Sequence, residues 1–254
     1  MNNNVIIPLL ISTVAGLSTV IGGLIVYLKI NRVEEFISFC LSFSLSVMIS
    51  ISIIELLPES IFQIIRYFGI LKGLILSIII FLIGMLLVNT INKKINSDKN
   101  ISPTNNRLYR VGILSMIALM IHNFPEGIAT FMSSYKDITL GINLALAIMM
   151  HNIPEGISIS VPIYYSTGSK KRGVGYSLLS GFAEPLGAIL TYILFKEYIN
   201  DLSLAFILIL VAGIMVTLSI NELLPESLKY NKNKYILYGL VVGVALVIIN
   251  HFIL

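Results

Sequence analysis

Apolar positions gather into eight long runs, separated by short polar segments. A helix that crosses the hydrocarbon core of a membrane needs about 20 residues, and each run is about that long. The runs lie near residues 5–28, 36–57, 69–91, 108–132, 138–163, 174–195, 202–224 and 235–253. The pattern predicts an all-α polytopic membrane protein with eight transmembrane helices. We expect residues 1–254 to form a single transmembrane domain surrounded by the lipid bilayer.

The composition supports a membrane protein. Hydrophobic residues make up 56% of the chain, charged residues 12%, and the mean hydropathy is +0.92. The net charge of +4 does not indicate a nucleic-acid partner, because the basic residues cluster in loops. The single cysteine, Cys40, excludes an intramolecular disulfide and a thiolate-rich metal site, and no resident cofactor is expected.

Lysine and arginine lie unevenly on the two sides of the predicted bundle. The loops after the first, third, fifth and seventh runs hold 13 of the 17 basic residues. Basic loops tend to stay in the cytoplasm, so both termini are expected on the extracytoplasmic side of the plasma membrane. Residues 92–107 are predicted to be a short, basic cytoplasmic linker.

Two similar six-residue words carry the candidate chemistry. They are His-Asn-Phe-Pro-Glu-Gly at 122–127 and His-Asn-Ile-Pro-Glu-Gly at 151–156. Residues four apart share one face of a helix, so each histidine is expected beside the glutamate of its own word. Two such helices side by side supply the nitrogen and oxygen donors of a divalent-metal site. The proline of each word is expected to bend its helix and free a carbonyl group.

A second repeated word predicts an inverted architecture. Glu-Leu-Leu-Pro-Glu-Ser occurs at 55–60 and again at 222–227. The charge count makes the two copies antiparallel, which is typical of transporters built from inverted repeats. The prediction is a 3+2+3 arrangement, in which helices 1–3 and 6–8 are inverted repeats around helices 4 and 5.

The inversion predicts acidic groups at both mouths of a pathway. Glu55 and Glu59 are expected toward the outer mouth, and Glu222 and Glu226 toward the cytoplasmic mouth. Met48 lies seven residues before Glu55, a spacing of two turns that predicts a shared face. The same spacing separates Met215 from Glu222.

The remaining helices differ in polarity. Glu184 stands beside Pro185 in a stretch rich in small residues, which let helices approach closely, so Glu184 is expected to point at the central site. The first, third and eighth helices are nearly pure apolar runs and are expected to form a scaffold.

The paired words resemble those of the ZIP (Zrt/Irt-like) family of divalent-metal transporters, most closely its bacterial zinc-uptake (ZupT-type) branch. The resemblance implies two adjacent metal positions between helices 4 and 5. One position would be lined by His122, Glu126, His151 and Glu155, and the other by Asn123, Glu126, Asn152, Glu155 and Glu184. Met48 and Glu55 match residues at the outer approach. The family's histidine-rich loop has no counterpart here, because the segment 92–107 holds no histidine.

The leading interpretation is a transporter that imports Zn²⁺, with Fe²⁺, Mn²⁺, Co²⁺ and Cd²⁺ as further cargo. Mixed histidine and glutamate ligands favour such ions over Cu⁺. An intramembrane metallohydrolase is disfavoured, because the His-Glu-x-x-His word is absent. A membrane scaffold would not need five buried acids. Channel-like permeation, proton coupling and a homodimer are left open.

Overall fold

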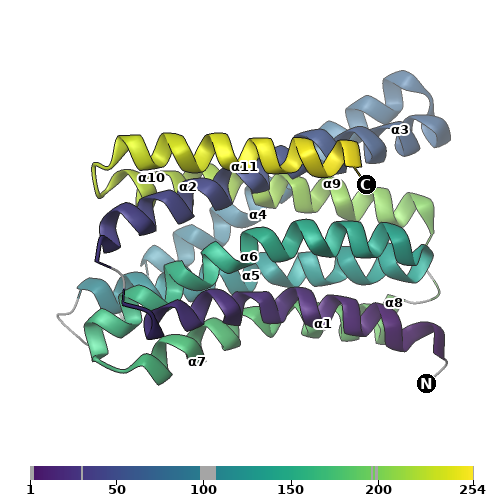
Figure 1. Ribbon diagram of the computed structural model, residues 1–254. Helices are drawn as coiled ribbons and strands as arrows, with labels where there is room; N and C mark the ends of the chain where they lie inside the picture. Colours follow the sequence, from purple (N-terminus) through teal and green to yellow (C-terminus); the bar gives the residue numbers. More distant parts are fainter. Residues whose placement is uncertain (1–2, 30, 98–106, 196, 198–199, 254) are drawn as a thin grey trace.

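Helices make up all the regular structure of the computed structural model, which describes residues 3–29, 31–97, 107–195, 197 and 200–253. In these residues the elements form eight helical rods, several of them built from consecutive segments (Figure 1). The bounds are α1 Asn3–Gly23 with η1 Leu24–Tyr27; α2 Val33–Ile51, η2 Ser52–Leu56 and α3 Leu57–Phe68; α4 Ile70–Ser97; α5 Arg107–Lys136; α6 Ile138–Thr167; α7 Lys170–Gly181 and α8 Ala183–Phe195; α9 Asp201–Leu218, η5 Ser219–Leu223 and α10 Leu224–Leu228; and α11 Asn233–Ile253. The all-α prediction is confirmed.

Each predicted apolar run coincides with one rod. The second rod continues to Phe68, well beyond the expected end near residue 57. Among the described residues, six helical stretches are long and apolar enough to cross a membrane, and the described part of α11 is a shorter apolar helix. The chain is therefore a multi-pass membrane protein. The helix α4 runs through Ser97 into the predicted linker, and residues 98–106 lie outside the described set.

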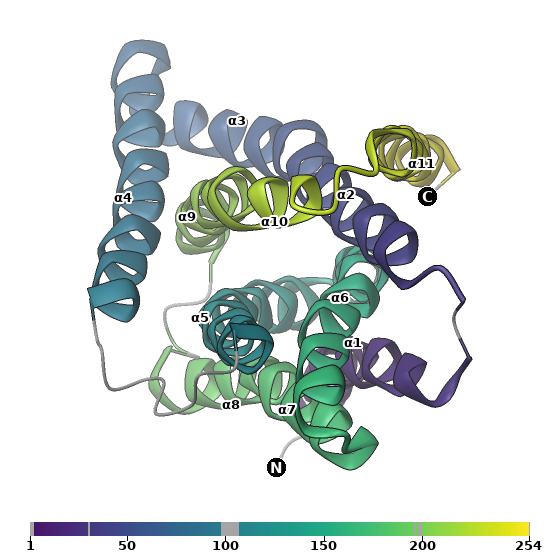
Figure 2. The same cartoon turned by 90° about the vertical axis from the view of Figure 1, so that its left-hand side faces the viewer.

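The rods pack into two groups, seen end-on in Figure 2. The first group contains α1, α5, α6, α7 and α8, and the second contains α2, α3, α4, α9, α10 and α11. The groups meet where α2 lies against α6 and where α5 lies against α9. Of the three helices expected to form a scaffold, α1 lies in the first group, where it packs directly on α6 and α5, and α4 and α11 lie in the second. An apolar sequence fits an internal helix contact as well as it fits lipid.

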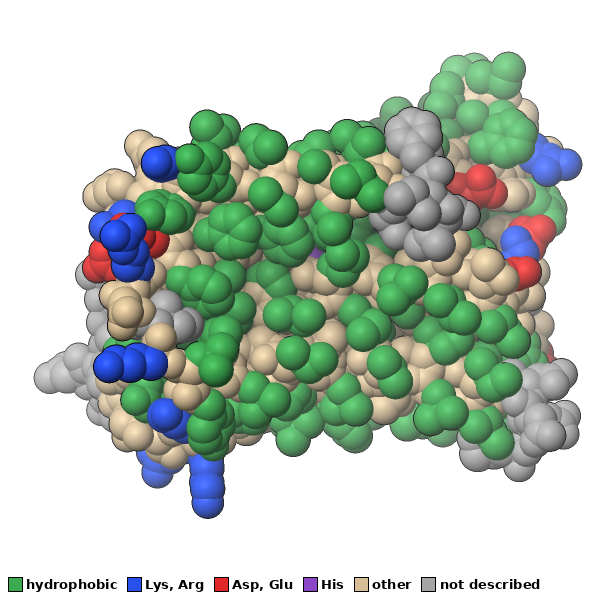
Figure 3. All heavy atoms as spheres, in the orientation of Figure 1, with side chains coloured by type: hydrophobic (Ala, Val, Ile, Leu, Met, Phe, Trp, Pro, Cys, Tyr) green, Lys and Arg blue, Asp and Glu red, His purple; other side chains and the backbone are tan. Residues whose placement is uncertain are grey.

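Charged side chains gather at the two ends of the bundle, with a broad apolar belt between them (Figure 3). One end carries the basic turns after α1, α6 and α10, and both termini lie at the other end (Figure 1). At the terminal end, α5 and α6 are joined at Asp137, whose side chain accepts a hydrogen bond from the backbone N–H of Leu140. The predicted membrane orientation depends on this separation of the basic turns from the two termini.

A π-helical turn precedes the Leu-Pro-Glu-Ser part of each repeated acidic word. This turn was not predicted from the sequence. The N–H of Leu57 donates to the Ser52 carbonyl, five residues back, and the N–H of Leu224 donates to that of Ser219. The next residue in each copy is a proline, which has no N–H for an ordinary helical hydrogen bond. The hydrogen bond just before the proline therefore spans five residues instead of four. Two-turn spacing does not hold across such a turn, so the spacing of Met48 and Glu55 no longer places them on one face.

The two copies contact each other through equivalent residues. Ser52 Oγ lies 3.7 Å from the sulfur of Met215, and Ser219 Oγ lies 3.8 Å from the sulfur of Met48. Both methionines are fully buried, at 0% and 1% exposure. The segments that lead into the two acidic words thus meet through a reciprocal pair of hydroxyl–sulfur contacts in the core of the second group.

The last glycine of each His-Asn word permits a close approach between helices. A Cβ atom on Gly127 would collide with the Glu184 carbonyl of α8, and one on Gly156 would collide with the Thr19 carbonyl of α1. Both obstacles are backbone atoms, which cannot move without shifting a whole helix. The words therefore fix the packing of α5 and α6 as well as placing polar side chains.

We expect Gly127→Ala and Gly156→Ala each to destabilise the protein by about 1–3 kcal/mol, because overpacking forces the backbone apart. Thermal unfolding of the purified protein in detergent measures the effect. Gly175→Ala in α7 is the matched control, since nothing lies within 4 Å of its added Cβ and alanine favours a helix. Equal melting temperatures for the three variants would contradict the packing argument.

Candidate metal site

The two His-Asn words meet at the centre of the first group. Both α5 and α6 remain helical through Pro125 and Pro154, so the words stay on neighbouring helices. Their side chains join across the helices, with His151 Nε2 at 2.9 Å from Glu126 Oε1. His151 is 0% exposed and Glu126 is 1% exposed. The contact joins the two words, as expected for two such helices lying side by side.

Glu184 reaches the same centre from α8. The helix is interrupted at Phe182, between α7 and α8, so Glu184 lies in the first turn of a new helix. A carboxylate is favoured there by the helix dipole. Asn152 Nδ2 donates to Glu184 Oε1 at 2.5 Å and lies 3.1 Å from the Ala15 carbonyl oxygen of α1. Proximity of Glu184 to the words is therefore as predicted, whereas the contribution of α1 was not predicted.

Two further polar residues complete the centre. Glu155 is 0% exposed, and both it and Glu126 act electrostatically on Glu184. Asn123 is also buried, and its Nδ2 donates to the Ser180 carbonyl at 3.4 Å. Of the predicted site residues, the side chain of His122 lies outside the described set. The other predicted metal-site residues, Asn123, Glu126, His151, Asn152, Glu155 and Glu184, are all buried.

In this arrangement candidate metal ligands are hydrogen-bonded to one another, His151 with Glu126 and Asn152 with Glu184. Among the described residues, no three His, Cys, Asp or Glu side chains already form a metal-holding cluster. At the centre, Asn123 Oδ1, Asn152 Oδ1 and Glu184 Oε2 are buried oxygens that accept no hydrogen bond from the described residues. Buried acceptors of this kind, beside three carboxylates and an imidazole, fit the chemistry of a divalent cation.

The second group touches the centre through Ser44. Its Oγ lies 3.5 Å from the His151 carbonyl oxygen and 3.8 Å from the sulfur of Met48. Met48 therefore lies beside the residue that contacts the site, although it lines neither of the two cavities described below. The sequence offered no signal that would separate Ser44 from the other serines of α2.

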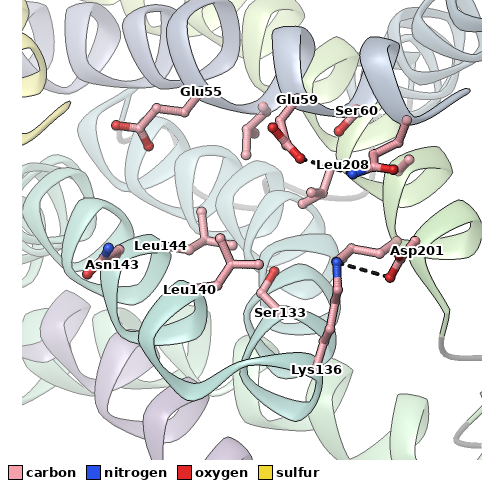
Figure 4. Close-up of a pocket in the computed structure, with 14 residues that line it drawn as sticks. Glu55, Glu59, Ser60, Ser133, Lys136, Leu140, Asn143, Leu144, Asp201 and Leu208 are labelled. Atoms are coloured by element: carbon pink, nitrogen blue, oxygen red, sulfur yellow. Dashed lines mark hydrogen bonds and ion pairs between the residues drawn. The ribbon is translucent and has the colours of Figure 1, made fainter. Parts of the chain in front are cut away.

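Acid-lined cavities lie on either side of the centre. The larger, here called the Glu59 cavity, has a volume of about 240 Å³ and includes Glu55, Glu59 and Asp201 in its wall (Figure 4). The smaller, the Glu226 cavity, has a volume of about 50 Å³ and is lined by residues that include Glu222 and Glu226. Both cavities are lined by residues of the two helix groups, so both lie at the boundary between the groups.

Comparison with known proteins identifies the family of this chain. A sequence model of the family described as "ZIP Zinc transporter" matches residues 92–251. The chain belongs to the ZIP family. The prediction of a transporter rather than an enzyme is confirmed by this membership.

Several bacterial relatives of the ZIP family match nearly the whole chain. The zinc transporter ZupT of Streptococcus mutans is 41% identical, and the alignment covers 98% of each chain. The ZupT of Oceanobacillus iheyensis is 40% identical with the same coverage. The ZupT of Clostridium perfringens is 38% identical over 98% of this chain and 96% of its own. The resemblance to the ZupT-type branch is thereby confirmed.

Asn152→Asp should make the stability of this ZIP protein more dependent on metal. A second carboxylate beside Glu184 would repel it in metal-free protein, and a bound cation would offset the repulsion. We expect the Zn²⁺-induced rise in melting temperature to exceed that of the wild type by about 3 °C or more, roughly 1 kcal/mol in a chain of this size.

The matched control for this variant is Asn89→Asp. It adds the same charge on α4, away from the centre, and keeps the oxygen that accepts a hydrogen bond from Asn221 at 2.9 Å. The Zn²⁺-induced shift of the control should equal that of the wild type. If Asn152→Asp shows the same shift as the control, Asn152 does not lie at a metal position.

Proposed function

We propose that this protein transports Zn²⁺ across the plasma membrane into the cytoplasm through the buried centre between α5 and α6. Fe²⁺, Mn²⁺, Co²⁺ and Cd²⁺ are proposed as further cargo. The observation that carries the proposal is a buried set of carboxylates, amides and an imidazole that lies between two acid-lined cavities. The names of the relatives, which describe them as zinc transporters, support zinc as the main cargo.

Two adjacent metal positions are proposed within the centre, with the glutamates of both words shared between them. The first is lined by His122, Glu126, His151 and Glu155. The second is lined by Asn123, Asn152 and Glu184 together with the shared Glu126 and Glu155. A neutral amide at Asn152 lowers the negative charge of the second position, which favours brief occupancy there.

The spacing of the described donors suits zinc. Two ligand atoms on one tetrahedral zinc lie roughly 3.3 Å apart, given metal–ligand distances of about 2.0–2.2 Å. His151 Nε2 and Glu126 Oε1 are already 2.9 Å apart. A separation of a few tenths of an ångström and the loss of the shared proton would therefore admit the ion. Zinc binding is expected to release that proton, because metal ligands must be deprotonated.

Movement between the two helix groups is proposed as the transport step. Backbone-to-backbone glycine contacts, such as Gly127 on α8 and Gly84 against Gly213, lie inside one group or the other. Such contacts resist sliding because neither backbone can yield. The boundary between the groups is formed instead by α2 against α6 and α5 against α9, where the two cavities lie. A small rocking of one group against the other would expose the centre to each cavity in turn.

An inverted 3+2+3 repeat is proposed to underlie this movement. Its support is the shared π-helical turn of the two acidic words and the reciprocal contacts of Ser52 with Met215 and Ser219 with Met48. In the proposed orientation, Glu55 and Glu59 face the outside, and Glu222 and Glu226 face the cytoplasm.

Transport is tested in vesicles that hold a zinc-sensitive dye. We expect Glu126→Gln and Glu155→Gln to reduce Zn²⁺ uptake at least about tenfold, since the loss of one group that positions a metal commonly costs 10–100-fold. Glu35→Gln, in the first turn of α2 and away from the centre, is the control and should transport like the wild type. Equal uptake by all the variants, each shown to be folded, would assign the pathway elsewhere.

The proposed orientation is tested with single cysteines introduced in a Cys40→Ala background. Tyr67→Cys changes a residue near the end of α3, the helix at the end of the molecule that holds the termini (Figure 1), and Lys171→Cys changes one at the basic start of α7. A membrane-impermeant thiol reagent applied to intact cells should label position 67 and spare position 171 until the cells are lysed. The reverse labelling would invert the topology and with it the assignment of the two mouths.

A further inference from the structure

One ion pair links the two helix groups at the Glu59 cavity. Lys136 ends α5 in the first group, Asp201 begins α9 in the second, and Lys136 Nζ lies 3.0 Å from Asp201 Oδ1. The ion pairs of Arg32 with Glu35, His151 with Glu126, Lys229 with Glu226 and Lys232 with Glu34 each lie within a single group. Lys136 and Asp201 are therefore placed to hold the groups together at this end.

The pair lies in the wall of the cavity, as Figure 4 shows. Ser60 and Ser133 also line the cavity, and each is 1% exposed. Among the described residues, neither hydroxyl has a hydrogen-bond partner. The same wall holds Glu55 and Glu59. The interior therefore offers carboxylates, together with the two unpaired hydroxyl groups, to a hydrated cation, and the ammonium group of Lys136 lies beside them.

We propose that Lys136 and Asp201 form an electrostatic latch on the Glu59 cavity, and that a hydrated divalent cation opens it by competing with Lys136 for Asp201. This inference rests on the proposed transport function, because the cation is the cargo. Lys136 acts on the cargo through Asp201 and is thus a positioning residue. In the closed latch the ammonium group of Lys136 occupies the position beside Asp201 that the arriving cation would take.

The exposure of the pair suits a reversible latch. Lys136 is 40% and Asp201 48% exposed, so water and salt screen their attraction and make the pair weak. A buried pair would be far harder to separate. Lys136 also lies ten residues beyond Glu126 on α5, about 15 Å along one helix. Release of the latch can therefore be passed to the centre by a rigid movement of α5.

The latch is tested by the accessibility of a reporter cysteine that lies on neither α5 nor α9, the two helices that carry the ion pair. Ser60→Cys on α3, in a Cys40→Ala background, is alkylated with a membrane-impermeant reagent in vesicles. Lys136→Gln and Asp201→Asn should each raise the alkylation rate about two- to fivefold, the range that a partly exposed ion pair gives. The charge-exchanged double variant, Lys136→Asp with Asp201→Lys, should return to the rate of the reporter background.

Lys72→Gln is the control for a general loss of positive charge. Lys72 is exposed near the start of α4, at the same end of the molecule. Its replacement should leave the alkylation rate unchanged. Unchanged rates in both single latch variants, an equal rise in Lys72→Gln, or failure of the charge exchange to restore the rate would each overturn the latch.

Competition with the cation is tested by the Zn²⁺ concentration that gives half-maximal uptake. Both single variants open the latch, yet they should shift this concentration in opposite directions. Lys136→Gln removes the competitor and should lower it, whereas Asp201→Asn removes the attracting carboxylate and should raise it. Shifts of the same sign, or none, overturn the competition. The alkylation rates need no transport, so a failure of zinc transport itself is distinguished from a failure of the latch.

Discussion

The structure depends on the burial of carboxylates within a bundle that crosses a membrane. Glu126, Glu155 and Glu184 are at most 1% exposed, and an acid at membrane depth costs roughly 2.5–3.5 kcal/mol. Part of this cost is offset by the hydrogen bond between His151 and Glu126 and by the one that Asn152 donates to Glu184. A cation would offset the remaining repulsion more fully than any neutral donor can. The buried carboxylates thus destabilise the metal-free protein, and the same charges attract its cargo.

Prolines and glycines bring the helices close enough for these bonds to form. Each of the three prolines nearest the centre follows a residue whose carbonyl oxygen lies against a glycine of a neighbouring helix. The pairs are the Phe124 carbonyl with Gly187, the Ile153 carbonyl with Gly22, and the Glu184 carbonyl with Gly127. A helix interface with small residues allows backbones to approach and contact directly. The proline and glycine of each word therefore build the frame that holds its polar side chains.

Much of this arrangement follows from the sequence because it depends on local periodicity. The apolar runs predicted all eight rods, and the repeated words predicted that Glu126, His151, Asn152 and Glu155 would be neighbours. The two π-helical turns were not predicted, because the proline after each one is equally compatible with a kink. The role of α1 was missed for a different reason: its contribution is the backbone carbonyl of Ala15, which leaves no trace in side-chain chemistry. The ion pair of Lys136 with Asp201 joins distant segments, and no pattern within either segment indicates it.

The two acidic words share a local structure, yet their surroundings differ in charge. Glu59 accepts a hydrogen bond from the neutral amide of Gln63 at 3.1 Å, whereas the equivalent Glu226 is paired with the ammonium group of Lys229. A cation that approaches Glu226 must compete with an ammonium group paired to that carboxylate, whereas in the Glu59 cavity the ammonium group of Lys136 is paired with Asp201 and not with Glu59. Under the proposed function, this difference favours capture at the Glu59 cavity and release at the Glu226 cavity. A bias in direction can therefore arise from residues just outside an otherwise symmetric repeat.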